Sequence, residues 1–123
     1  MPATILLVDD TAAIRRALRL YIEAETNWKI VGEAENGKMA IDLVRALHPD
    51  IVLLDLSMPI MNGLEAARHI SAIAPETRML MFTLHAYPHL LREARNAGIK
   101  DVISKSDEVC PKVLTAIRSL LAA

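Results

Sequence analysis

Four short segments rich in apolar residues each end at a side chain that can do chemistry. Asp9 and Asp10 follow the first of these segments, and Asp55 follows the second. The hydroxyl of Thr83 and the amine of Lys105 follow the other two. Because these residues are far apart in the sequence, they can form one site only in a fold that brings the ends of the segments together.

Acidic, cationic and hydroxyl groups of this kind suit the transfer of a phosphoryl group. Crowded carboxylates repel one another, and a divalent cation removes that penalty. Hard oxygen ligands select magnesium, calcium or manganese, and magnesium also shares the phosphate of its substrate. A lysine pairs with a phosphoryl oxygen as a point charge. We therefore predict phosphoryl transfer onto a carboxylate. Asp55 is the expected nucleophile because it stands alone, whereas Asp9 and Asp10 are paired for metal binding.

The apolar residues around these positions follow two different periods. Segments that are apolar at nearly every position predict buried parallel strands, and apolar residues three or four apart predict helices. The strands are expected at 5–8, 29–33, 51–54, 79–82 and 101–104. The helical stripes run over 14–22, 40–47, 64–70, 90–97 and 109–120.

This strict alternation of strand and helix predicts the fold class. It implies an α/β fold with a parallel sheet and helices on both faces. A chain of 123 residues is too short for an eight-stranded barrel, so we expect one domain, 1–123, with a single doubly wound five-stranded sheet in the flavodoxin-like order 2-1-3-4-5. Ligands of such sheets bind where the winding reverses, outside the carboxyl ends of the strands. In this order that point lies between the first and third strands, after which the acids stand.

Several stretches of the sequence resemble the receiver domains of bacterial two-component response regulators. The sharpest are Val8-Asp9-Asp10 and the segment 54–63, Leu-Asp-Leu-Ser-Met-Pro-Ile-Met-Asn-Gly. The threonine and the lysine also stand at the expected points in the order of elements. The segment 32–37, Gly-Glu-Ala-Glu-Asn-Gly, is similar to the second strand-helix junction of receivers attached to helix-turn-helix DNA-binding domains.

The resemblance implies a role for each residue of the acidic group. Asp55 would accept a phosphoryl group from a histidine kinase or a phosphotransfer protein. Mg2+ would be held by Asp10, Asp55 and the backbone carbonyl of Ser57, with Asp9 binding largely through water.

The resemblance also implies a switch. Lys105 would pair with the phosphoryl group, and Thr83 would move toward it after transfer. The face formed by helix 4, strand 5 and helix 5 would then change its partner preference and control an output, with transcription favoured and homodimer formation on activation left open. Catalysis would be limited to the chain's own phosphorylation and dephosphorylation, so an enzyme with an external substrate is not expected. Docking of a phosphotransfer domain would occur near the first helix, whose residues Arg15, Arg16 and Arg19 are otherwise expected to form a solvated face.

Three positions depart from the usual pattern of such domains. Val102 stands where an aromatic residue usually takes part in the switch, so that switch is not expected in its usual form. Leu84 follows Thr83 where a small residue is common, and it is expected to narrow access to the phosphoryl group. Ser106 stands where many receivers carry a proline, which makes a cis peptide bond costly there.

Bulk composition limits the class of function. With 53% hydrophobic and 24% charged residues, the chain is typical of globular proteins. Its net charge of -1 argues against a surface that binds nucleic acid, and no apolar run approaches the length of a membrane span. We expect a cytoplasmic protein that binds neither membrane nor nucleic acid. DNA contact is expected only through a further C-terminal domain.

Two other functions remain as alternatives. A haloacid-dehalogenase-like phosphatase also uses an aspartyl phosphate, but it usually carries a second acid two residues after the nucleophile, where this sequence has Thr11 and Ser57. A receiver-like interaction module that never takes phosphate is opposed by the intact acidic set, while Val102 and Leu84 leave it some room. The chain is either a complete single-domain regulator or the receiver of a transcription factor, and the second is favoured.

Overall fold

Strand and helix alternate along the chain. The structure is a computed structural model that describes residues 1–84, 86–105 and 108–122. The strands are β1 (Thr4–Val8), β2 (Lys29–Ala34), β3 (Ile51–Leu54), β4 (Arg78–Thr83) and β5 (Ile99–Ser104). The helices are α1 (Ala12–Glu25), α2 (Gly37–Leu47), α3 (Gly63–Ile73), α4 (Leu90–Asn96) and α5 (Val109–Ala122). Ser106, which was expected to disfavour the cis peptide bond of many receivers, lies outside the described residues.

The strands form one parallel sheet in the order β2-β1-β3-β4-β5, as predicted. Strand bounds differ from the expected ones by one or two residues at some ends. Thr83, expected just beyond the fourth strand, is the last residue of β4 and pairs with Ser104 of β5. The reason is that the β4–β5 ladder, which begins at Met79 and Ile99, continues to the rim of the sheet.

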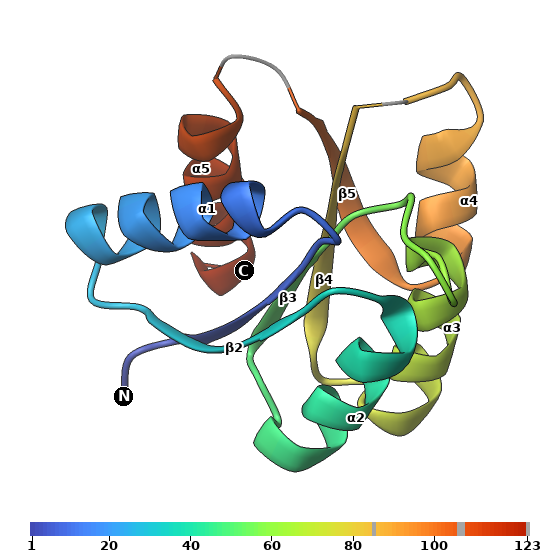
Figure 1. Ribbon diagram of the computed structural model, residues 1–123, viewed down its shortest axis with the longest axis horizontal. Helices are drawn as coiled ribbons and strands as arrows, with labels where there is room; N and C mark the ends of the chain where they lie inside the picture. The colour runs from blue at the N-terminus through green and yellow to red at the C-terminus, as the bar shows by residue number, and fades with distance from the viewer. Residues whose placement is uncertain (85, 106–107, 123) are drawn as a thin grey trace.

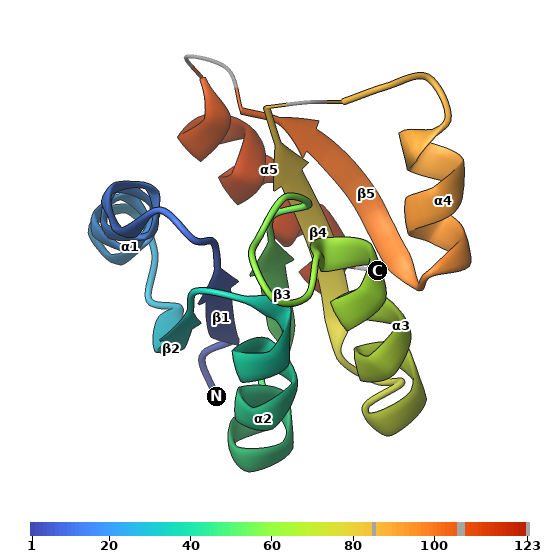
Figure 2. The ribbon, with the colours of Figure 1, turned by 45° about the vertical axis from the view of Figure 1, so that its right-hand side comes forward.

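Helices cover both faces of the sheet (Figures 1 and 2): α1 and α5 lie on one face, and α2, α3 and α4 lie on the other. Successive side chains of a strand point to opposite faces. In β1, Leu6 and Val8 join the core under α2 to α4, whereas Ile5 and Leu7 join the core under α1 and α5. Burial on both faces explains why the central strands are apolar at nearly every position.

Local side-chain bonds fix where two of the helices begin. Asn62 and Glu65 form a reciprocal capping box at the start of α3, and the Asn36 side chain accepts from the Met39 amide at the start of α2. Among the described residues, no helix combines the length and the apolar character that crossing a membrane requires.

Candidate functional site

The register of the sheet brings the acidic residues together. Val8 of β1 pairs with Leu54 of β3, so the next residue of each strand leaves the sheet at the same rim. The Asp55 amide donates to the Val8 carbonyl at 2.9 Å, and the Asp9 amide donates to the Ala34 carbonyl at 3.0 Å. Backbone pairing therefore fixes the positions from which both acidic side chains start.

The acidic residues form the kind of cluster that can hold a metal ion. Asp9, Asp10 and Asp55 each offer one carboxylate oxygen, and these oxygens lie within 4.8 Å of one another. Asp9 and Asp55 are 0% and 5% exposed, whereas Asp10 is exposed. Buried carboxylates this close need a cationic partner, and an all-oxygen set suits Mg2+.

Lys105, which follows directly after β5, supplies one cation at the same rim of the sheet. Its ammonium Nζ lies 2.6 Å from Asp9 Oδ2 and 3.2 Å from Asp55 Oδ2. The same ammonium lies 4.9 Å from the centre of the Phe82 ring, and the Lys105 amide donates to the Thr83 carbonyl at the end of β4. The predicted amine thus reaches the acids, and it lies closer to Asp9 than to Asp55.

The surroundings of Asp55 disfavour its ionised form. Burial raises the pKa of its carboxyl group, the Lys105 ammonium lowers it, and the negative charge of Asp9 raises it again. The net result is a pKa above the ordinary value. One lysine therefore does not fully offset the desolvation of this carboxylate, which is consistent with room for a further cation.

A pocket of about 220 Å³ opens over Asp55. Its lining comes from four strand ends, the loops that follow them and the first turn of α1, and comprises Asp10, Thr11, Ile14, Asp55, Ser57, Thr83, Leu84 and Lys105. Thr83 is 1% exposed, whereas Leu84 is 64% exposed at the rim. The structure thus brings the predicted site residues together: all but Asp9 line this pocket, and Asp9 is buried in contact with Lys105.

The loop after β3 closes tightly over the Asp55 backbone. A Cβ atom on Gly63 would lie 2.1 Å from the Asp55 carbonyl oxygen, and the Gly63 amide donates to the Leu56 carbonyl at 2.8 Å. Within the loop, Ile60 has a φ of 69°, and the Met61 amide donates to the Pro59 carbonyl. The Asn62-Gly63 pair therefore does more than form a turn: position 63 must be glycine, because a Cβ atom there would collide with the Asp55 carbonyl oxygen.

One residue that contacts the site was not predicted. Arg15 of α1 was expected on a solvated face, which fits the exposed Arg16 but is wrong for Arg15. The Arg15 guanidinium donates to the carbonyl of Asp9 and pairs with Glu33, and its side chain is only 14% exposed. Its spacing on the helix was visible in the sequence, but no local signal indicates a partner 18 residues away on β2.

Comparison with known proteins gives consistent matches. A family model described as the response regulator receiver domain matches residues 5–116. The transcriptional regulatory protein YdfI of Bacillus subtilis is 42% identical over 101 residues, which are 82% of this chain and 47% of YdfI. Protein CcdB of the same organism is 38% identical over 117 residues, which are 95% of this chain and 96% of CcdB. The chain therefore spans about half of the length of one relative and nearly all of the other.

A solved structure shows the same similarity in three dimensions. The two-component response regulator of the LuxR family from Aurantimonas sp. SI85-9A1 superimposes with a TM-score of 0.92 and 35% sequence identity. The match covers 99% of this chain and 86% of that one.

Proposed function

This chain belongs to the response regulator receiver domains, and from that premise we propose that Asp55 is its phosphoacceptor. One observation carries the proposal: a buried carboxylate has oxygens of two further carboxylates within 4.8 Å and the Lys105 ammonium 3.2 Å away. Neither alternative function gains support from the family match. A dehalogenase-like phosphatase would also need a second acid near the nucleophile, and Ser57 occupies that position.

We propose that the metal ion of this site is Mg2+. Asp9, Asp10, Asp55 and the backbone carbonyl of Ser57 are the proposed ligands, and the three carboxylate oxygens within 4.8 Å of one another fit an oxygen-binding cation. The exposed Asp10 is the carboxylate most open to an incoming ion. When bound, Mg2+ would offset the negative charge of the carboxylates and of the phosphoryl oxygens.

In the proposed reaction, a carboxylate oxygen of Asp55 attacks the phosphorus atom of a phosphohistidine on a histidine kinase or phosphotransfer protein. A P–O bond forms and the P–N bond breaks, and the imidazole leaves with the electron pair of that bond. Lys105 pairs with a phosphoryl oxygen as a point charge, and the Thr83 hydroxyl donates to another. Catalysis stays limited to the chain's own modification.

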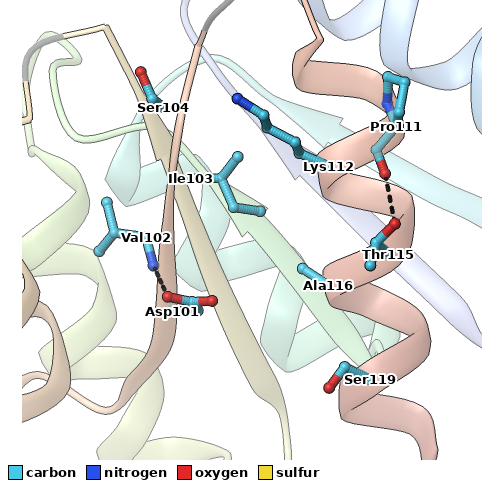
Figure 3. Close-up of a pocket in the computed structure, with 9 residues that line it drawn as sticks. All are labelled: Asp101, Val102, Ile103, Ser104, Pro111, Lys112, Thr115, Ala116 and Ser119. Atoms are coloured by element: carbon cyan, nitrogen blue, oxygen red, sulfur yellow. Dashed lines mark hydrogen bonds between the residues drawn. The ribbon is translucent and has the colours of Figure 1, made fainter.

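The output surface that we propose consists of α4, β5 and α5. A groove of about 550 Å³ runs between β5 and α5 (Figure 3), lined by Asp101 to Ser104 on the strand and by α5 side chains such as Lys112 and Ala116. Asp101 Oδ1 accepts from the Val102 amide at 2.8 Å, which occupies a backbone donor of the edge strand. That amide is therefore already bonded, which leaves one donor fewer for an added strand. A transcriptional output is favoured because YdfI is a transcriptional regulatory protein.

Intact-mass measurement tests the phosphoacceptor. With Mg2+ and a small phosphodonor, the wild type is expected to gain one phosphoryl group. Asp55→Asn should gain none, and Asp42→Asn on the exposed surface of α2 should behave like the wild type. Modification of Asp55→Asn, or modification that does not need a divalent cation, would contradict the proposal.

Because Leu84 can hinder a small phosphodonor, the experiment also needs a protein phosphodonor. This side chain is 64% exposed at the rim of the pocket, so it can hinder a small donor without blocking transfer from a protein. If the wild type stays unmodified, Leu84→Ala and a phosphorylated histidine kinase of demonstrated activity on a related receiver are tested next. Failure of both would favour a receiver that acts without phosphate.

A further inference from the structure

Arg15 connects the acidic site to the neighbouring strand. It lies in the first turns of α1, and its Nε donates to Glu33 Oε1 of β2 at 2.9 Å. A terminal nitrogen of the same guanidinium donates to the backbone carbonyl of Asp9. Arg19, one turn further along α1, also pairs with Glu33, at 2.8 Å. The described contacts of Arg19 are with Glu33 and Glu23 and do not include Asp9.

The carbonyl that Arg15 binds belongs to the peptide that joins Asp9 to Asp10. Because a peptide unit is planar, fixing its carbonyl fixes the direction in which the chain continues. The other polar groups of Asp9 are also held: its carboxylate accepts from the Thr11 amide at 2.7 Å and from Lys105 at 2.6 Å. Among the described residues, the contact of the Asp10 side chain is a weak one with the Thr11 hydroxyl at 3.5 Å. The orientation of Asp10 therefore depends on the peptide that Arg15 holds.

Glu33 keeps the arginine in place. Burial by itself raises the pKa of Glu33, but the hydrogen bonds from Arg19 and Arg15 outweigh this effect, and the pKa is lowered. The carboxylate therefore remains charged at neutral pH and holds the Nε atom of the guanidinium, while a terminal nitrogen binds the Asp9 carbonyl. Two hydrogen bonds restrict the orientation of the Arg15 guanidinium far more than one would, because the group is planar and its donors point in fixed directions.

We propose that Arg15 is a positioning residue for the divalent cation, acting through the Asp9–Asp10 peptide. This inference rests on the proposed metal site. It assigns to Arg15 no contact with the cation or the phosphoryl group.

Charge and positioning predict opposite effects when Arg15 is replaced. A guanidinium next to a cation site repels the cation, so its removal strengthens cation binding if charge alone matters. Loss of an oriented support weakens cation binding, and removal of such outer contacts typically costs about 10-fold or more in metal affinity. The direction of the change therefore separates the two effects.

Isothermal titration with Mg2+ alone tests the proposal on the whole chain, with Arg19→Met as the matched control. Arg15→Met is expected to bind Mg2+ about 10-fold more weakly than the wild type. Arg19→Met, which also loses a pair with Glu33, is expected to stay within about twofold because it leaves the Asp9 carbonyl bond intact. Thermal unfolding of both variants without metal measures the purely structural cost of losing each ion pair.

Unchanged or tighter Mg2+ binding by Arg15→Met would overturn the inference while leaving the metal site itself in place. Equal weakening in both variants would also overturn it, because a general loosening of α1 would then be the cause. If Arg15→Met does not fold, Arg15→Lys replaces it: the charge remains, but one ammonium cannot reproduce both guanidinium bonds, so weaker binding is still expected. A wild type that binds no Mg2+ would overturn the proposed metal site and this inference together, which is a distinguishable result.

Discussion

At the scale of single residues, the site places two buried carboxylates beside a single ammonium group. Asp55 and Asp9 are both buried, and Lys105 bridges their Oδ2 atoms at 3.2 and 2.6 Å. The raised pKa of Asp55 follows first from burial and then from the charge of Asp9, against the opposing effect of Lys105. An ionised Asp55 is thus a cost to the folded state that a chemical function can explain.

Replacing Asp55 by asparagine is expected to stabilise the metal-free protein. The raised pKa means that the folded state binds the Asp55 proton more tightly than the unfolded state does. The free energy of unfolding therefore falls as the pH rises from the ordinary value through the folded pKa, and it stays lower above that range. Asp55→Asn removes this loss, so urea denaturation at neutral pH in the presence of a chelator should show a higher midpoint for the variant.

A neutral control and a pH series make this expectation specific. Asp42→Asn on the exposed surface of α2 should change the free energy of unfolding by less than about 0.5 kcal/mol. At acidic pH, where Asp55 is protonated in the wild type too, the difference between the wild type and Asp55→Asn should shrink. An advantage of the variant that grows as the pH falls would contradict the assignment.

At the scale of elements, the loop between β3 and α3 is the tightest part of the site. Its closure depends on Gly63, whose absent Cβ leaves room for the Asp55 carbonyl oxygen. The capping box of Asn62 and Glu65 fixes the start of α3 in the same place. The loop therefore packs against the Asp55 backbone at its α3 end, and its residue Ser57 lines the pocket.

Gly63→Ala is expected to destabilise the fold by about 3 kcal/mol, the upper end of over-packing costs. The new methyl group would lie 2.1 Å from the Asp55 carbonyl oxygen and 3.1 Å from Leu56 Cα, and both are backbone atoms that cannot rotate away. Gly32→Ala is the matched control, because its nearest contacts are the side-chain ends of Leu47 and Leu6 at 3.0 and 3.2 Å. Urea denaturation of both variants should show the larger loss for Gly63→Ala, and equal losses would contradict this account.

At the scale of the whole molecule, sequence pattern predicted the architecture because both layers of the core leave a periodic signal. Buried parallel strands are apolar at nearly every position, helices carry an apolar stripe, and the resulting order of strands brings their carboxyl ends to one rim. The contacts that this pattern could not predict each depend on a single backbone carbonyl oxygen. Arg15 with the Asp9 carbonyl and Gly63 with the Asp55 carbonyl are of this kind, since a backbone acceptor carries no mark in the sequence.

The same architecture implies that Mg2+ stabilises the entire fold. The proposed ligands follow β1 and β3, neighbouring strands in the middle of the sheet, and an unfolded chain does not bring them together. A ligand that binds only the folded state, at 100 times its dissociation constant, adds about 2.7 kcal/mol to the free energy of unfolding. We therefore expect Mg2+ to raise the melting temperature of the wild type in a concentration-dependent way.

Asp10→Asn separates this linkage from general effects of salt. Asp10 is exposed and has no ion pair among the described residues, so its replacement should leave the metal-free melting temperature nearly unchanged. The same variant loses a ligand carboxylate, and its melting temperature should respond to Mg2+ far less than that of the wild type. Scanning calorimetry at matched ionic strength with Na+ in place of Mg2+ measures both quantities. An equal response of the two proteins to Mg2+ would mean that the cation binds elsewhere, and the three-carboxylate site would then lose its proposed role.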